Sequence, residues 1–252
     1  MSLEKTRHFI ASLPLDDDAP RPKFAAKGPV EAVDIDNLPD GLVTGSNLLQ
    51  FEGDLSPQLR SSVALSLLAA QRVAANDPIT QTPDQWVARH NTVLQNLNWS
   101  IQGGGHIKSK FDNIDVAVHQ AIIPFLATAF TGGMGGGSLI IAALDQMKKI
   151  DADKPWITLF NRESRRFEVT EYQFSVVKKE GLNTTLQMAC ARFDATFGQT
   201  QVLFVDVTTQ KAEFMAAKSA MAADSSLLAA MNEDLKLKLA AQTKSFIASL
   251  PL

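Results

Sequence analysis

The sequence predicts an α+β domain in which an apolar helical region precedes an antiparallel sheet of about four strands and C-terminal helices. Three observations lead to this prediction. Helix start signals dominate the first half of the chain, aromatic and β-branched residues at strand-like spacing follow, and the tail is rich in Ala and Leu. Helices and strands that occupy separate stretches of a chain are typical of α+β folds.

Length, charge and cysteine content exclude several classes of protein. The chain has 252 residues, of which 45% are hydrophobic and 20% charged, as in an ordinary globular protein. Its net charge of -3 provides no overall basic field for nucleic acid. A single cysteine excludes an intrachain disulfide and a multi-cysteine zinc site. The apolar stretch after Arg7 is shorter than a secretory signal requires, so we expect a cytoplasmic protein or export by a signal-independent route.

Local signals place the first elements. Residues 28–55 carry Gly, Pro and Asp at close intervals and are interpreted as loops with one short extended piece. Ser56 as N-cap and Pro57 at the first helical position open a helix that must stop before residue 78, a proline. Thr82–Gln85 forms a capping box that opens the next helix. The glycines at 103–105 are expected to end it.

Residues 116–144 contain no Asp, Glu, Lys or Arg, and a run of glycines at 132–137 divides them. Neither half reaches the roughly 20 apolar residues of a transmembrane helix. We therefore expect a buried helical hairpin with a glycine-rich turn. The alternative is a membrane-inserting hairpin or the wall of a lipid pocket.

From Pro155 onwards the spacing becomes strand-like. Strands are predicted at 156–160, 167–177, 184–193 and 200–208, and their short connections favour antiparallel hairpins. The Ala- and Leu-rich tail at 212–246 is interpreted as one or two helices.

A seven-residue repeat links the two ends, because Phe9–Leu15 recurs as Phe246–Leu252. One interpretation is a tandem array, in which 1–15 is the tail of a preceding copy, 16–27 is a linker and 28–252 is a single domain. In the other, both ends are docking peptides that occupy equivalent grooves. A tandem array would make a neighbouring copy of the domain a partner.

The only cysteine, Cys190, falls within a predicted strand. Alternation places it on the same face as Met188. A lone cysteine commonly behaves as a small buried hydrophobe, and apolar burial makes the thiol a poor nucleophile without a base. The candidate bases are His90, His106 and His119, whose spacing does not match a metal site.

The chain resembles the bacterial Evf (Erwinia virulence factor) type through Cys190 in the sequence MACARF, three quarters of the way along, and through its order of an apolar helical region, a sheet and closing helices. The resemblance extends over about residues 40–250 in outline. It implies a compact fold whose cysteine carries a fatty acyl group (a palmitate-type chain) as a thioester in an apolar tunnel, and an association with bacterial persistence in the insect gut.

Under this hypothesis the protein is a virulence-factor-like lipoprotein that holds its acyl chain as a structural fill, a carried group or an acyl-transfer intermediate. Burying a sixteen-carbon chain would contribute on the order of 10 kcal/mol. The expected lining of the lipid pocket is apolar, and comprises Ile122, Ile123, Phe125, Leu126, Leu139, Ile140 and Met188. The alternatives are a membrane-active toxin that uses the 116–144 hairpin and a non-catalytic module of a tandem array.

Overall fold

The computed structural model describes residues 2–15, 33–110, 118–130, 136–146, 154–167, 169–194 and 213–250. Its helices are α1 (Leu3–Ser12), α2 (Pro57–Asn76), α3 (Pro83–Asn96), α4 (Val118–Ala129), α5 (Ser138–Gln146), α6 (Pro155–Ser164), α7 (Ser225–Ala230) and α8 (Asn232–Phe246). Its strands are β1 (Gly41–Thr44), β2 (Asn47–Glu52), β3 (Ser100–Lys110), β4 (Arg165–Arg166), β5 (Val169–Glu180), β6 (Asn183–Asp194), β7 (Glu213–Asp224) and β8 (Ile247–Ser249). The α+β class is confirmed.

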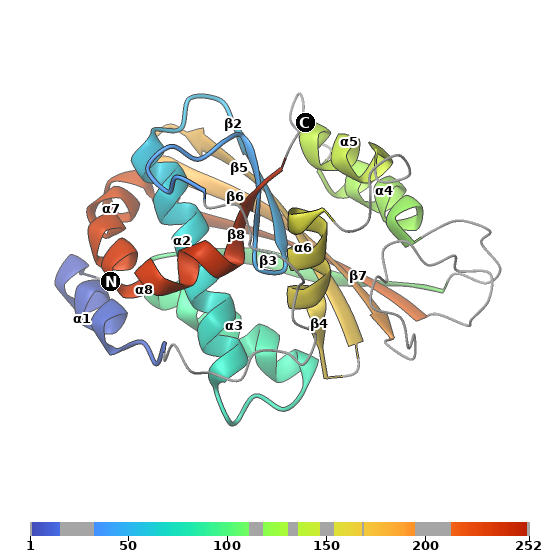
Figure 1. The fold of residues 1–252 in the computed structure, drawn as a ribbon, viewed down its shortest axis with the longest axis horizontal. Coiled ribbons are helices and arrows are strands. Elements are labelled where there is room, and N and C mark those ends of the chain that lie inside the picture. The colour runs from blue at the N-terminus through green and yellow to red at the C-terminus, as the bar shows by residue number, and fades with distance from the viewer. Residues whose placement is uncertain are drawn as a thin grey trace.

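One mixed sheet organises the described part of the molecule (Figure 1). Its strand order is β3-β7-β6-β5-β2-β1-β8, and the short β4 pairs with β5. Neighbouring strands are antiparallel except β2 and β5, which run parallel. With eight strands in the described residues, the sheet is larger than the four-stranded sheet expected from the sequence.

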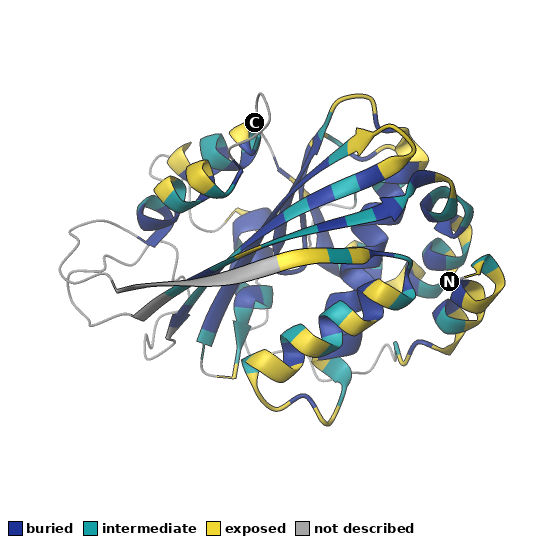
Figure 2. Ribbon diagram, turned by 180° about the vertical axis from the view of Figure 1, so that it is seen from behind, coloured by how far each residue is buried: buried dark blue, intermediate teal, exposed yellow. Residues whose placement is uncertain are grey.

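Helices cover both faces of the sheet and create two separate apolar cores (Figure 2). Side chains of α1, α2, α3, α7 and α8 build the core on one face, which we call the α2–α3 face. Side chains of α4, α5 and α6 build the core on the other face, the α4–α5 face. Strand β6 alternates between them as predicted, since Met188 lies on the α2–α3 face and Ala189 on the α4–α5 face.

The two helix starts predicted from local signals are confirmed. The Ser56 hydroxyl accepts a hydrogen bond from the backbone N–H of Leu59 at the start of α2. The Thr82 hydroxyl accepts from the Gln85 N–H, and the Gln85 side chain accepts from the Thr82 N–H, so α3 begins with a reciprocal capping box. These predictions succeed because each cap depends on residues within one turn of one another.

Two predicted loop or turn regions are strands. The segment at 28–55 contains β1 and β2, a hairpin in which Gly45 supplies a positive φ of 56°. The glycines at 103–105 do not end α3. They lie inside β3, which pairs with β7 over its length, and α3 ends earlier, at Asn96.

In two further regions the predicted secondary structure is wrong, because a predicted strand is a helix and part of a predicted helix is a strand. Residues 156–160 belong to α6, where Pro155 occupies the first turn and four apolar side chains fall on one helical stripe: Trp156, Ile157, Leu159 and Phe160. The first part of the predicted C-terminal helix is strand β7, which β3 and β6 hold by hydrogen bonds on both sides. The strand predicted at 200–208 lies outside the described residues.

The described parts of the uncharged segment form two helices, as expected for a helical hairpin, while residues 131–135 of the expected glycine-rich turn lie outside the described residues. Helices α4 and α5 contact each other and pack on the α4–α5 face, where Ile122, Leu126 and Ile140 are buried. In the described part of the chain, no helix combines the length and apolar character that a membrane span requires.

The N-terminal repeat packs on this domain as helix α1, beside α8 (Figure 1). Arg7 pairs with Asp234 at 3.0 Å, and the Lys238 ammonium donates to the Ala11 carbonyl at 3.0 Å. The C-terminal repeat instead forms β8, which pairs with β1. The proposed linker at 16–27 lies outside the described residues, and the tandem origin of the repeat stays a prediction.

Candidate functional site

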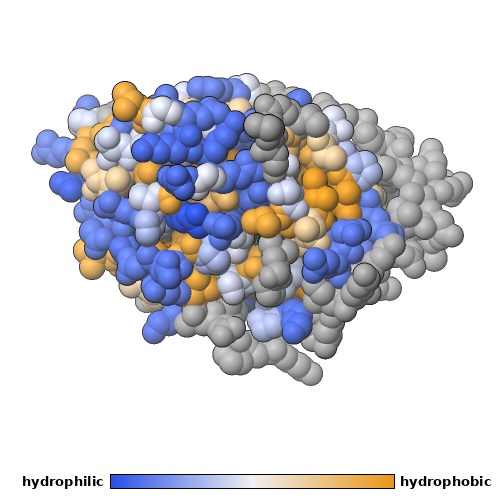
Figure 3. All heavy atoms as spheres, turned by 90° about the horizontal axis from the view of Figure 1, so that it is seen from above, coloured by the Kyte–Doolittle hydropathy of each residue, from blue (hydrophilic) through white to orange (hydrophobic). Residues whose placement is uncertain are grey.

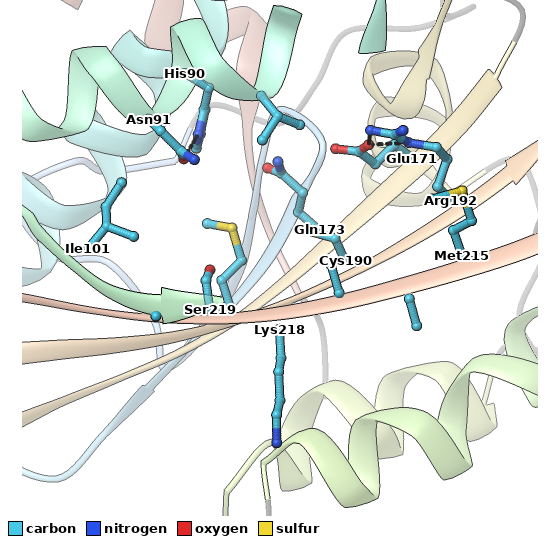
Figure 4. A pocket seen from close by; sticks show the side chains of 15 residues that line it. His90, Asn91, Ile101, Glu171, Gln173, Cys190, Arg192, Met215, Lys218 and Ser219 are labelled. Carbon is cyan, nitrogen blue, oxygen red and sulfur yellow. Dashed lines mark hydrogen bonds and ion pairs between the residues drawn. The ribbon is translucent and has the colours of Figure 1, made fainter. Parts of the chain in front are cut away.

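Cys190 lies at the centre of the sheet, on the α2–α3 face. On β6 its Cα partners are Gln173 of β5 and Ala217 of β7. The cysteine is partly buried and opens into a pocket of about 300 Å³ (Figure 4). The only thiol of the chain therefore faces a hollow between the sheet and helix α3.

The floor of the pocket is mainly apolar. Met188 and Met215 flank the cysteine on β6 and β7, Ala217 leaves room beside it, and Ile101 of β3 completes this side. Lys218 belongs to the same strand as Ala217 but points away from the pocket, towards the opposite side of the sheet (Figure 4). An apolar ligand thus has contacts on β3, β6 and β7.

Polar side chains line the adjoining part of the pocket, from β5, β6 and α3. Arg192 donates to one carboxylate oxygen of Glu171 at 2.8 Å and to Asp84 at 3.0 Å. Gln173 follows Glu171 on the same face of β5, and both side chains are buried. His90 lines the same pocket from α3, next to Asn91 (Figure 4). The pocket is therefore amphipathic, with a polar wall beside an apolar floor.

His90 is held as a neutral imidazole. Its ring stacks on Trp86 with 4.9 Å between centroids, and the Arg166 guanidinium lies 3.8 Å from the centre of the Trp86 ring. Burial lowers the pKa of His90 to about 4; the hydrogen bond with Asn91 opposes that shift and the charge of Arg166 adds to it. At neutral pH the imidazole carries no charge.

The Cys190 thiol is protonated at neutral pH. Burial raises its pKa well above the ordinary value, and the nearby Glu171 carboxylate raises it further. Arg192 and Arg166 oppose this shift but do not outweigh it. The site consequently does not activate the thiol as a nucleophile.

The structure brings together only two of the predicted acyl-site residues. Met188 and Cys190 line the same pocket. The six predicted lining residues of the α4–α5 hairpin belong to the opposite face of the sheet: Ile122, Ile123, Phe125, Leu126, Leu139 and Ile140. The reason is the alternation of β6, which turns Ala189 and Ala191 towards the hairpin and Cys190 away from it.

Of the three candidate bases, His90 lines the pocket, whereas His119 is buried in α4 and His106 belongs to β3. Sequence reasoning did not single out Glu171 and Gln173. A signal for them was present, because polar residues recur at every second position from 171 to 175, which indicates a polar stripe on one face of a strand. Among the described residues, no three His, Cys, Asp or Glu side chains form a group suited to a metal ion.

Comparison with known families finds no family model that matches the chain, and comparison with curated proteins finds no match. Solved structures that are similar to it include two toxins and one virulence factor. The activated Cyt2Ba monomer from Bacillus thuringiensis subsp. israelensis has 15% sequence identity and a TM-score of 0.37, over 71% of this chain and 97% of that one. A delta-endotoxin has 13% identity and a TM-score of 0.36, over 81% and 88% of the two chains. The Evf virulence factor has 11% identity and a TM-score of 0.36, over 99% and 91%. The resemblance to Evf expected from the sequence is thus present as a weak structural similarity.

Proposed function

We propose that this virulence-factor-like protein carries a fatty acyl group as a thioester on Cys190, with the acyl chain in the pocket beside it. One observation carries the proposal: the single thiol of the chain opens into a hollow with an apolar floor. The virulence role is part of the proposal through the resemblance noted in the sequence.

The size of the pocket limits the chain that it can enclose. Its volume of about 300 Å³ is about twice that of an engineered cavity of about 150 Å³ that binds benzene. It therefore has room for about ten to twelve carbon atoms. At about 0.8 kcal/mol per buried methylene, ten methylenes would contribute about 8 kcal/mol. A longer chain would extend past the rim at Gly103, which is exposed.

The acyl group would arrive from an activated donor, the thioester of another thiol. The Cys190 sulfur attacks the acyl carbon, a new S–C bond forms, and the bond to the donor sulfur breaks. The proton of Cys190 leaves with the departing thiolate, so no oxidant or reductant is needed.

The raised pKa of Cys190 favours a held acyl group over a transfer intermediate. A thiol of high pKa is a poor leaving group, so the thioester is slow to exchange once formed. The same property makes the first acylation slow, and a stable acyl group is compatible with one acylation in the life of the protein.

Intact mass spectrometry tests the proposal on protein expressed in a bacterial host. The expected result is the mass of the chain plus one acyl group, which hydroxylamine removes. A Cys190→Ser variant should show only the unmodified mass, and Met188→Leu, which keeps the thiol, should retain the adduct. Wild-type protein of unmodified mass from several hosts would overturn the proposal.

A second candidate function is membrane contact through the α4–α5 hairpin. Its described helices carry no charged residue before Asp145, and apolar side chains gather at this part of the surface (Figure 3). Ile123, Phe125 and Ile141 are only partly buried there. Leakage of a dye from anionic and neutral liposomes tests it. Leakage that Ile123→Glu abolishes would support this function, and its absence at every pH and lipid composition would exclude it.

A further inference from the structure

Three buried acceptor atoms in the wall of the Cys190 pocket have no hydrogen-bond partner in the described part of the chain. They are Nε2 of His90, Oε1 of Glu171 and Oε1 of Gln173. The three residues are 2%, 4% and 2% exposed, and all three line the pocket. An unpaired buried polar group destabilises the folded state, so a ligand that supplied donors to these atoms would gain free energy on binding.

Each of the three atoms is left as an acceptor by its surroundings. Arg192 occupies only the Oε2 atom of Glu171, so Oε1 remains open. Nδ1 of His90 lies 3.4 Å from the Asn91 side-chain oxygen. A proton on Nδ1 satisfies that oxygen and leaves Nε2 as an acceptor. Gln173 contributes an amide carbonyl oxygen.

The charges at this wall are already paired. Arg192 lies between the carboxylates of Glu171 and Asp84, His90 is neutral at pH 7, and the Arg166 guanidinium lies over the Trp86 ring. A cationic group would meet these arginines, whereas a neutral hydroxyl or amide donor would not. The adjoining floor offers Met188, Met215 and Ile101 to an apolar group.

We propose that the pocket selects a neutral amphiphile whose polar end carries O–H or N–H donors. Its donors bind the acceptors of His90, Glu171 and Gln173, and its apolar part lies on β6 and β7. The inference deepens the proposed function and rests on it in one respect: an acyl group on Cys190 would carry such a donor, as a hydroxyacyl chain does.

The placement of the acceptors favours a group close to the thiol. Gln173 is the direct cross-strand partner of Cys190, and Glu171 is the partner of Arg192 in the next row of the same face. Two residues along a strand span about 6.5–7 Å. Hydroxyl groups on adjacent carbon atoms lie closer together than this. One of them can bind Gln173 or Glu171 while the chain remains on the methionine floor.

Two probes of the same chain length separate donor recognition from apolar binding. The first is 1,2-octanediol, and the second is its dimethyl ether, which keeps the chain and the oxygen atoms but has no donor. Binding is measured by calorimetry in Cys190→Ala protein, in which no thioester can form. We expect the diol to bind at least about tenfold more tightly than the ether, because the ether leaves buried acceptors unpaired.

Gln173→Leu and Met188→Leu are the matched variants. Gln173→Leu removes one acceptor, so the preference for the diol should shrink towards equality. In the free protein this variant should also raise the urea midpoint, because an unpaired buried atom is lost. Met188→Leu changes the apolar floor that both probes contact, so it should alter the two affinities in parallel and keep their ratio.

Equal affinity for the two probes would overturn the inference, as would no binding of either up to its solubility limit. A lower urea midpoint in Gln173→Leu would also overturn it, because the amide would then have a partner in the folded protein. Acylation of wild-type Cys190 is measured separately by mass, so failure of either proposal can be recognised without the other.

Discussion

The two copies of the repeated segment adopt different secondary structures within one chain. The first copy completes helix α1, whereas the second leaves α8 at Phe246 and continues as strand β8. Seven consecutive side chains are identical in the two copies. Their own helix and strand propensities therefore cannot decide the outcome, and the difference comes from the surfaces on which each copy packs.

Each copy buries the side chains that its conformation turns towards those surfaces. In the first copy, Ile10 of α1 and Leu13, the C-cap three residues later, are buried, and Ala11 is exposed. In β8 the equivalent Ile247 and Ala248 are both buried, in the cores on opposite faces of the sheet. A strand between two covered faces buries successive residues, and a helix on one surface does not.

Hydrogen bonds at the ends of each copy stabilise its conformation. At α1 the Ser2 hydroxyl caps the helix and Leu13 ends it before Pro14. At β8 the Phe246 carbonyl accepts from the Gly45 N–H at 2.8 Å, and the Leu250 N–H donates to Gly41 at 3.0 Å. Backbone groups of the second copy thus form hydrogen bonds with β1 and the turn that follows it.

Removing the first side chain of each copy should give the largest contrast. Phe246 is 6% exposed and lies under Arg72, whose guanidinium is 4.2 Å from the ring centre. Phe246→Ala should lower the free energy of unfolding by about 3–5 kcal/mol. Phe9 is only partly buried, so Phe9→Ala should cost about 1–2 kcal/mol. Urea unfolding measures both changes. Equal losses of stability would contradict the difference in burial between the two copies.

Replacing the two isoleucines by alanine should destabilise different parts of the molecule. Ile10 and Ile247 are each 1% exposed, so either change to Ala removes a buried side chain worth about 2–4 kcal/mol. Ile247→Ala should destabilise the whole sheet. The effect of Ile10→Ala is limited by the free energy with which α1 docks, so amide exchange should increase in α1 and not in β5 or β6. Faster exchange throughout the sheet in Ile10→Ala would contradict this expectation.

The alanines test the difference in packing. Ala248 is 4% exposed and lies in the core of the α4–α5 face, so Ala248→Val should cost about 1–3 kcal/mol by overpacking. Ala11 is exposed on α1, and Ala11→Val should cost about 0.5 kcal/mol through helix propensity alone. Thermal unfolding distinguishes the two variants. A larger loss of stability for Ala11→Val would contradict the placement of Ala248 in the core and of Ala11 on the surface.

The serines should show the smallest effects and serve as controls. Ser12 and Ser249 are both exposed, and the Ser12 hydroxyl donates to the Phe9 carbonyl at 2.8 Å within α1. Each change to Ala should alter the free energy of unfolding by less than about 0.5 kcal/mol. A loss above 1 kcal/mol at Ser249, measured by urea unfolding, would indicate a contact beyond the β1 pairing.

The candidate site was predictable only in part. Its thiol, the strand that carries it and the neighbouring Met188 follow from the alternation of β6. The hairpin was assigned to the same pocket because both are apolar, yet it covers the opposite face. Apolar character indicates that a segment is buried, but it does not indicate on which face of a sheet.

The amino-acid sequence alone determined the starts of α2 and α3, the two faces of β6 and the α+β class. These features depend on contacts within a few residues, or on a period of two along one strand. The tertiary structure decided the helix at 155–164, the strand at 213–224 and the two conformations of the repeat. It also placed Glu171, Gln173 and His90 around Cys190. In each of these cases the deciding partner is distant in the chain, so no local pattern contains it.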